Sequence, residues 1–208
     1  MIRQLNTEFG RYYVTPDGIF PSVTTVLSSI PNPHLKAWQD KVGLEVANKV
    51  SKNACALGNR LHAYCEDYLN GQSPTLDVFD KQAFYGIDKH LKLITPYAVE
   101  KRFWSRKIKS AGTIDVVGKY DGRLSIIDFK TTSKDKFSGE FDNYWLQLAS
   151  YCFMIFERTG TLVDQLVIIM QHTSGETVIF KEHPDKWIRE YVKVRSAFED
   201  KSHLIELT

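Results

Sequence analysis

The sequence predicts an α/β protein in which a central mixed β-sheet is flanked by helices and preceded by an N-terminal helical region. Three observations support this prediction. Apolar residues recur at intervals of three and four between residues 35 and 94, which is the period of amphipathic helices. From residue 97 onward, short runs rich in Val, Ile and aromatic residues indicate strands. A helical pattern near residues 143–158 separates the third run from the fourth, as in a crossover between strands.

The length of 208 residues suits a single domain, residues 1–208, and 43% hydrophobic residues can supply its core. We expect a mainly helical N-terminal part and cap in residues 1–95 and the sheet core in residues 96–208. In the N-terminal part, the elements expected in order are a hairpin in 10–23, a short helix capped by Ser22, two or three helices within 35–69, and an amphipathic helix over 78–94 that Pro96 ends.

The second part alternates between the two periods. One stripe of apolar residues, including Trp145, Leu148 and Cys152, defines the crossover helix, and Trp187 and Tyr191 define the last one. The expected strands are 97–105, 113–120, 123–131, 165–171 and 177–180, and the expected helices are 143–158 and 184–201.

A tight turn at Asp121-Gly122 joins the second and third strands, because both residues tolerate the positive φ that a type I′ turn needs. In a two-residue loop, Tyr120 faces Arg123. Asp115 and Asp128 each lie five residues beyond that first pair, so they face each other as a non-hydrogen-bonded pair with Cα atoms about 4.5 Å apart. Opposed carboxylates destabilise a sheet, and a divalent cation held between them is the most economical reason for the arrangement.

Lys130 projects from the same strand face as Asp128. Together with Asp115 it completes a site of two acids, one base and a metal ion. An exposed strand end with an ordinary salt bridge is the alternative. A second acid-x-Lys triplet, Glu199-Asp200-Lys201, lies in a predicted helix without an upstream acid, and we interpret it as a solvated charge cluster.

Two helical pairs four residues apart are further candidates. His62 and Glu66 could both ligate a metal, although a surface polar stripe or a hydrogen-bonded core histidine is the commoner meaning of this spacing. Gln147 and Tyr151 lie beside the apolar stripe of the crossover helix. For that pair, a surface glutamine and a core tyrosine are an equally good interpretation.

The charge balance gives no strong global field, since 27 basic and 25 acidic residues leave a formal net charge of +2. Nucleic-acid binding would therefore need a local patch. One segment interleaves cations with aromatic residues, a pattern that suits phosphates and stacked bases, although basic strand edges also protect against aggregation. The candidate residues are Lys101, Arg102, Trp104, Arg106, Lys107 and Lys109.

Cys55, Cys65 and Cys152 are odd in number and lack metal-ligand spacing, which favours free thiols in a reducing compartment. The first residues have no apolar signal region, and no segment approaches eighteen uninterrupted apolar residues. We expect a soluble intracellular protein with no membrane partner, from a bacterial cytoplasm or the cytoplasm of a phage-infected host.

The ordered motifs resemble those of RecB-like nucleases in the PD-(D/E)XK superfamily, and within it the group of the mitochondrial genome maintenance exonuclease and its phage relatives. The resemblance covers roughly residues 20–182, including the early segment Pro21-Ser-Val-Thr-Thr-Val-Leu27. The matching motifs are His62-x-x-x-Glu66, Glu100, Gly112-Thr-Ile-Asp115, Asp128-Phe-Lys130 and Gln147-Leu-Ala-Ser-Tyr151.

This resemblance implies a restriction-endonuclease-like fold and a role for each motif residue. Lys130 would orient or polarise the attacking water, and Gln147 and Tyr151 would position the metal centre or the scissile phosphate. Glu100 would be an acidic residue that contacts the metal ligands rather than the metal ion. The implied ligands of Mg²⁺ or Mn²⁺ are Asp115, Asp128, the carbonyl of Phe129, His62 and, less directly, Glu66.

The implied activity is metal-dependent hydrolysis of phosphodiester bonds by a DNA exonuclease, acting on single strands with a free end during replication, recombination or repair. A structure-selective or nonspecific endonuclease is the nearer alternative, and a non-catalytic DNA-binding module of the same fold is the other. Relatives with an iron–sulfur cluster carry three cysteines after the crossover helix. Cys152 stands alone there, so we expect no cluster.

Overall fold

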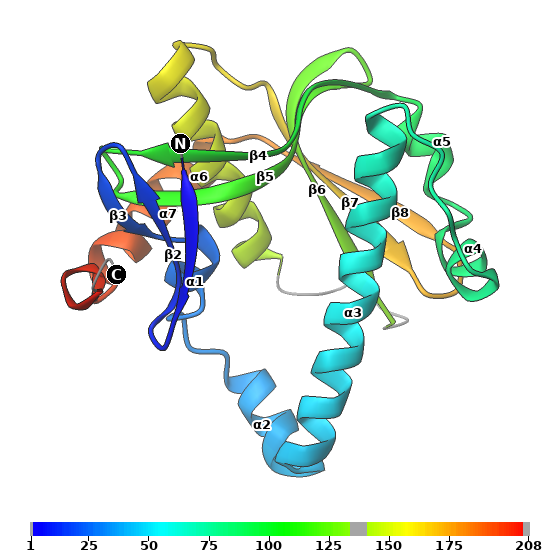
Figure 1. Ribbon diagram of the computed structural model, residues 1–208, viewed down its shortest axis with the longest axis horizontal. Helices are drawn as coiled ribbons and strands as arrows, with labels where there is room; N and C mark the ends of the chain where they lie inside the picture. The colour runs from blue at the N-terminus through cyan, green and yellow to red at the C-terminus, as the bar shows by residue number, and fades with distance from the viewer. Residues whose placement is uncertain (1, 134–140, 206–208) are drawn as a thin grey trace.

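The computed structural model describes residues 2–133 and 141–205 and contains two β-sheets surrounded by helices (Figure 1). The strands are β1 (Arg3–Thr7), β2 (Gly10–Thr15), β3 (Gly18–Pro21), β4 (Ile94–Ser105), β5 (Ser110–Tyr120), β6 (Arg123–Thr132), β7 (Gln165–His172) and β8 (Thr177–Glu182). The helices are α1 (Val23–Leu27), α2 (Pro33–Val42), α3 (Leu44–Leu69), α4 (Val78–Phe84), α5 (Asp88–Leu91), α6 (Asp142–Thr159) and α7 (Asp185–Ala197), followed by a 3-10 turn at Ser202–Leu204.

The larger sheet has the strand order β4-β5-β6-β7-β8. Neighbouring strands are antiparallel except β6 and β7, which run parallel and are connected through α6. A parallel pair needs such a crossover, and the helical pattern between the two strand runs indicates it. The predicted mixed sheet flanked by helices is thus confirmed.

The β5–β6 hairpin has the predicted turn. Asp121 and Gly122 both have positive φ, 51° and 80°, as a type I′ turn requires. Pairing follows the predicted register from Tyr120 opposite Arg123 onward. The paired stretch ends one step before Asp115 and Asp128, so these two residues do not form the ladder pair that the turn predicts.

Helices cover both faces of the larger sheet, and successive residues of its central strands point to opposite faces. On β6, Ile126 packs with α1, α6 and α7, whereas Ile127 packs with α3, α4 and α5. On β7, Ile168 packs with the same group of residues as Ile126, and Val167 packs with the same group as Ile127. A strand buried on both faces is typical of a parallel pair, and it holds β6 rigidly in the centre of the molecule.

The smaller sheet, β1-β2-β3, packs beside the outer strands of the larger sheet (Figure 1). Its attachment is polar as well as apolar. The Tyr13 hydroxyl lies 3.2 Å from the Thr113 hydroxyl on β5, and the indole of Trp104 on β4 donates to Asp17 over 2.7 Å. Ser22 follows β3 and caps α1, since its hydroxyl accepts the N–H of Thr25, as predicted.

The structure differs from the prediction in three places. The strand β1 was not expected. The last helix, expected over 184–201, ends at Ala197, so Glu199-Asp200-Lys201 does not lie in a helix and Asp200 instead pairs with Arg195.

The single helix expected over 78–94 is instead two short helices, α4 and α5, and Ile94 already belongs to β4. Tertiary contacts explain the break between α4 and α5. The Gln171 side chain donates a hydrogen bond to the carbonyl of Ala83. Gly86 packs so closely on Gly175 that a Cβ added at Gly86 would lie 2.4 Å from the Gly175 carbonyl oxygen.

The helix α2 and the first half of α3 project from the body as an arm (Figure 1). Asn32 caps α2 by accepting the N–H of Leu35, and Gly43, at φ 82°, separates the two helices. No residue of α2 is buried. Among the helices that the structure describes, none has an apolar stretch long enough to cross a membrane.

Candidate active site

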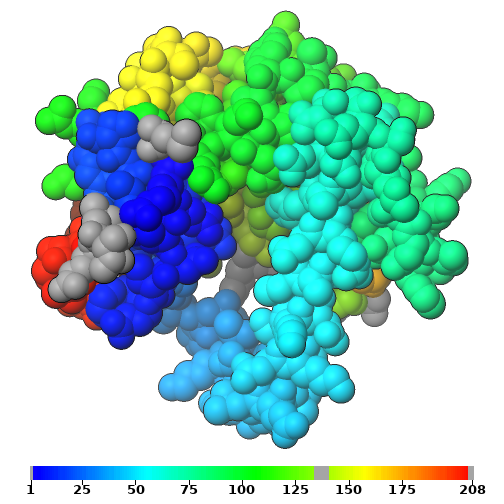
Figure 2. All heavy atoms as spheres, viewed as in Figure 1, coloured from blue at the N-terminus to red at the C-terminus, as the bar shows by residue number. Residues whose placement is uncertain are grey.

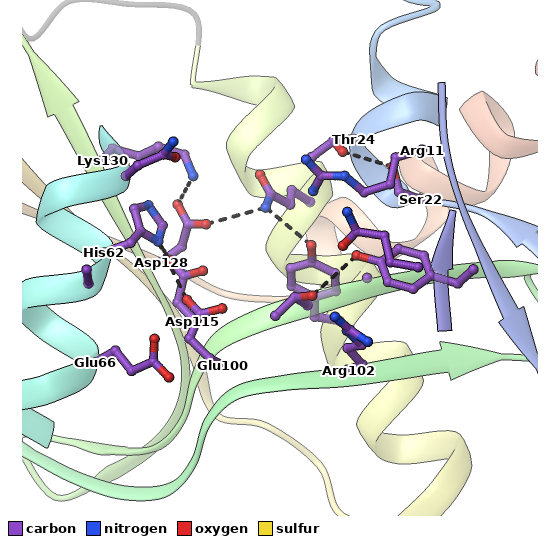
Figure 3. A pocket seen from close by; sticks show the side chains of 18 residues that line it. Arg11, Ser22, Thr24, His62, Glu66, Glu100, Arg102, Asp115, Asp128 and Lys130 are labelled. Atoms are coloured by element: carbon purple, nitrogen blue, oxygen red, sulfur yellow. Dashed lines mark hydrogen bonds and ion pairs between the residues drawn. The ribbon is translucent and has the colours of Figure 1, made fainter. Parts of the chain in front are cut away.

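Three acidic residues, Glu100, Asp115 and Asp128, follow one another across three adjacent strands of the larger sheet. In the β4–β5 ladder, Val99 pairs with Val116 and Lys101 pairs with Ile114. Glu100 of β4 therefore lies opposite Asp115 of β5. Asp128 of β6 comes directly after the last β5–β6 pair, on the same side as Asp115. All three line one pocket (Figure 3). Concentrating negative charge in this way costs stability unless a cation compensates it.

The strands β5 and β6 separate at these acids because a side chain replaces a backbone partner. An Asp115 carboxylate oxygen accepts the N–H of Phe129 over 2.9 Å. This contact corrects the expectation that Asp115 and Asp128 oppose each other as a ladder pair. Both carboxylates nevertheless line the same pocket, so the two acids still belong to one site.

His62 reaches the acids from α3. Its Nδ1 lies 3.3 Å from Asp115 and 3.7 Å from Glu100. Burial alone would lower the pKa of His62, but hydrogen bonds to Asp115 and Glu100 and their charges raise it to about 10. Glu100 is one of the few non-glycine residues with positive φ, 49°, and such a local distortion re-aims a strand side chain. Without a metal ion, the imidazolium thus compensates part of the acidic charge.

Lys130 forms a close ion pair with the buried carboxylate of Asp128. Burial raises the pKa of Asp128 to about 6, with a further contribution from Asp115, while Lys130 opposes the rise. Burial alone would lower the pKa of Lys130, but Asp128 and Asp115 raise it. Its ammonium also lies 5.1 Å from the ring centre of Tyr144. The lysine therefore carries a positive charge beside the acidic row.

Gln147 and Tyr151 of α6 close the pocket beside Asp128. The Gln147 amide lies 3.4 Å from the Asp128 carboxylate and 3.3 Å from the Tyr151 hydroxyl. Burial raises the pKa of Tyr151 well above its usual value, so the phenol keeps its proton. Gly112 makes room for this ring, because a Cβ there would lie 2.7 Å from Tyr151 Cε1.

The pocket lies between α3 and the smaller sheet and has a volume of about 560 Å³. Figure 2 shows the surface hollowed between the smaller sheet, in blue, and α3, in cyan. The predicted residues that line the pocket are His62, Glu66, Glu100, Arg102, Gly112, Asp115, Asp128, Lys130, Gln147 and Tyr151. Residues from five elements far apart in the sequence are thus brought together.

Glu66 lies one turn beyond His62, and burial, together with the charge of Glu100, raises its pKa. In the predicted basic segment, only Arg102 lines this pocket. Trp104 is engaged elsewhere, because the guanidinium of Arg158 stacks 3.1 Å from its ring centre. Lys107 and Lys109 lie by a separate depression next to α7.

Sequence reasoning missed the residues that the smaller sheet and α1 contribute, namely Gln4, Arg11, Tyr13, Ser22 and Thr24. Arg11 and Tyr13 are two apart in β2 and therefore share a strand face. That spacing was the available signal, but nothing in the sequence shows which surface this face meets.

The donor set suits a hard divalent cation. One ligand atom each from His62, Glu100 and Asp115 can be chosen so that all lie within 4.8 Å of one another. Carboxylate oxygens suit hard divalent cations, and an imidazole nitrogen also suits transition-metal ions. Glu100, expected to contact the ligands rather than the metal ion, thus lies among the candidate ligand atoms.

Comparisons with known proteins gave several matches. A sequence model of the PD-(D/E)XK nuclease superfamily matches residues 56–201. Mitochondrial genome maintenance exonuclease 1 of Homo sapiens is 30% identical over 149 residues, which are 64% of this chain and 43% of that protein. The Mus musculus protein of the same name is 26% identical over 145 residues, or 63% of this chain and 43% of that protein.

The chain thus spans less than half the length of these two relatives. Among solved structures, a candidate exonuclease from Eubacterium rectale is 19% identical with a TM-score of 0.48, over 69% of this chain and 64% of the other. The superfamily match extends over most of the chain, from the second half of α3 to the end of α7. This chain belongs to the PD-(D/E)XK nuclease superfamily.

Proposed function

We propose that this protein is a metal-dependent DNA exonuclease that acts on single strands with a free end. The observation that carries the proposal is the row of Glu100, Asp115 and Asp128 beside His62 and Lys130 in one pocket. The two mammalian exonucleases that the chain resembles support this type of activity, although each is more than twice as long as the matched segment.

The acidic row with His62 would hold Mg²⁺ or Mn²⁺. Asp115, Asp128, the Phe129 carbonyl and His62 are the proposed ligands, with Glu66 close by. We add Glu100 to this set because its carboxylate lies within reach of the same point as Asp115 and His62. When bound, a divalent cation supplies a nucleophile at neutral pH and neutralises charge on the phosphate.

The surrounding residues would act on the phosphate itself. Lys130 holds a positive charge against Asp128, where it can orient water and offset charge that develops on the phosphorus. Tyr151 keeps its proton, and Gln147 fixes the direction of its hydroxyl. Both side chains are therefore positioned to bind a phosphate oxygen.

The position of the pocket supports action at strand ends. Its walls are α3 on one side and the smaller sheet on the other, so a strand enters between two separate parts of the molecule. We propose that a free end is threaded between these two walls, which a circle without an end cannot do. We further propose that the N-terminal helices that line the pocket, α1 and the second half of α3, form the cap over this path.

The test compares linear single strands, labelled separately at the 5′ and 3′ ends, with a circular single strand in Mg²⁺ and in EDTA. We expect stepwise shortening of the linear strands in Mg²⁺ only, and an intact circle. Lys130→Ala should reduce turnover about a thousandfold. Lys193→Ala, on the exposed surface of α7, is the control and should retain it.

Efficient cutting of the circle would instead establish an endonuclease that shares the site. A wild-type protein that binds DNA but neither binds Mn²⁺ nor cleaves any strand would be a non-catalytic binding module, and the proposal would be rejected.

A further inference from the structure

The pocket has two ends of opposite charge. The acidic row lies at one end, beside His62 and Glu66 of α3 (Figure 3). Arg11 of β2 and Arg102 of β4 lie at the other, on the side away from α3 (Figure 3). A metal site explains the acidic end, but the proposed chemistry does not use either arginine.

Neither guanidinium is neutralised within the part of the chain that the structure describes. Arg102 donates one hydrogen bond, 3.1 Å long, to the carbonyl of Ile2 and forms no ion pair with a described carboxylate. The Arg11 side chain likewise has no acidic partner among the described residues. Arg60 and Arg195, by contrast, are paired with Asp80 and Asp200.

The backbone of Arg11 is firmly held while its side chain is exposed. Its N–H donates to the Thr25 hydroxyl over 3.0 Å, and its carbonyl accepts the N–H of Ser22 over 2.8 Å. Ser22 and Thr25 anchor α1, so Arg11 is fixed to the same unit. Because this backbone is already fixed, a ligand that binds Arg11 has to order only its side chain.

Neutral hydroxyls complete this end of the pocket. Thr24 lies beside Arg11, with its hydroxyl 2.9 Å from that of Ser22, and Thr113 lies opposite Arg102 in the β4–β5 ladder. Arginine and threonine are among the side chains that contact nucleic-acid phosphates most often, and a guanidinium can donate two parallel hydrogen bonds to one phosphate.

From these contacts we propose that Arg11 and Arg102 form a second anion site, which binds a non-scissile phosphate of the strand whose scissile phosphate lies over the acidic row. The Gln147 amide lies 3.4 Å from the Asp128 carboxylate, and Tyr151 packs against Gly112, which is next to Thr113 in β5, so both would contact a strand that occupies the two ends. The inference rests on the proposed function for its substrate. It adds residues that set strand position and affinity.

The test measures DNA affinity without turnover, by fluorescence anisotropy of a labelled single strand in EDTA at several salt concentrations. Arg11→Gln and Arg102→Gln should each weaken binding about tenfold. Each should also make the dependence of log affinity on log salt less steep by about 0.7 for one lost phosphate contact. Arg189→Gln, on the exposed side of α7, is the matched control.

Strands with a 5′-phosphate, a 5′-hydroxyl or a 3′-phosphate separate the two sources of the phosphate. Equal losses on all three identify an internal phosphodiester, whereas a loss confined to one phosphorylated end identifies a terminal phosphomonoester. Affinity and salt dependence that match the Arg189→Gln control on every strand would overturn the second anion site.

Mn²⁺ titration of the same variants distinguishes this inference from the proposed function. We expect unchanged Mn²⁺ affinity, which also shows that the variants are folded. A variant with reduced Mn²⁺ affinity would mean that the arginine supports the acidic end, and the second site would be rejected. If the wild-type protein cleaves nothing, the proposed function fails, while the affinity measurements still decide whether the arginines bind phosphate.

Discussion

The two halves of α3 share one helical period but lie in different surroundings. In the first half, Leu44 and Val46 are 71% and 51% exposed. In the second half, Leu61 and Cys65 are completely buried against the larger sheet. The first half belongs to the projecting arm, whereas the second half packs on β6 (Figure 1).

This difference shows what an apolar period can and cannot predict. The period identifies side chains that share a helix face, but it does not show whether another element covers that face. The covered half holds His62 at a fixed distance from the acids, so packing and the candidate site coincide there. In the arm, all of which the structure describes, only Ala47 is buried and no residue lines the pocket.

The largest expected difference between the two regions is in activity. Asp115→Asn keeps an oxygen that can accept the N–H of Phe129, so the fold should survive, but it removes a charge from the acidic row. We expect about a thousandfold or greater loss of nuclease turnover. Asp40→Asn, the same change on the exposed arm, should have no effect on turnover. Equal activity of the two variants would contradict the site assignment.

The next difference is in stability. Leu61→Ala leaves a cavity in a completely buried position and should lower the free energy of unfolding by about 2–5 kcal/mol. Leu44→Ala makes the same change at an exposed position and should alter it by no more than about 0.5 kcal/mol. Urea unfolding followed by circular dichroism measures both. Similar losses would mean that another part of the protein covers the arm in solution.

The smallest expected difference depends on pH and tests the contact between α3 and the acids. The pKa of His62 is raised to about 10 in the folded protein, above its usual 6.5. The charged imidazolium therefore stabilises the metal-free fold below pH 6.5, and this stabilisation is lost as the pH rises toward 10.

Between pH 6 and pH 9, the metal-free wild type should lose on the order of 1 kcal/mol more stability than His62→Gln, a modest figure because a third of the imidazole is exposed. Urea unfolding in EDTA at both pH values measures this. Parallel pH profiles for the two proteins would show that His62 does not interact with the acids.

Local signals predicted the larger sheet well. The Asp121-Gly122 turn fixed the β5–β6 register, and Asp128 and Lys130 follow from it by strand alternation. The positions of Gln147 and Tyr151 follow from the helical period of α6. In each case, neighbours in the sequence determine the geometry.

Contacts between distant segments could not be predicted in this way. A four-residue loop, Arg106–Lys109, joins β4 to β5, and the sequence does not fix their register, so the position of Glu100 opposite Asp115 was missed. Arg11 was missed because the smaller sheet docks through tertiary contacts. The helix expected over 78–94 is broken by a tertiary contact as well, since the Gln171 side chain donates a hydrogen bond to the carbonyl of Ala83.

The distribution of the acidic row over three strands has a consequence for the newly synthesised chain. Glu100, Asp115 and Asp128 come from β4, β5 and β6, and His62 comes from a helix made earlier, so no single hairpin or helix contains the proposed metal site. A partly folded chain would hold the ion weakly and would spare the DNA around it. Under the proposed function, cleavage would therefore report completion of the fold, and the nuclease would act only in its fully folded form.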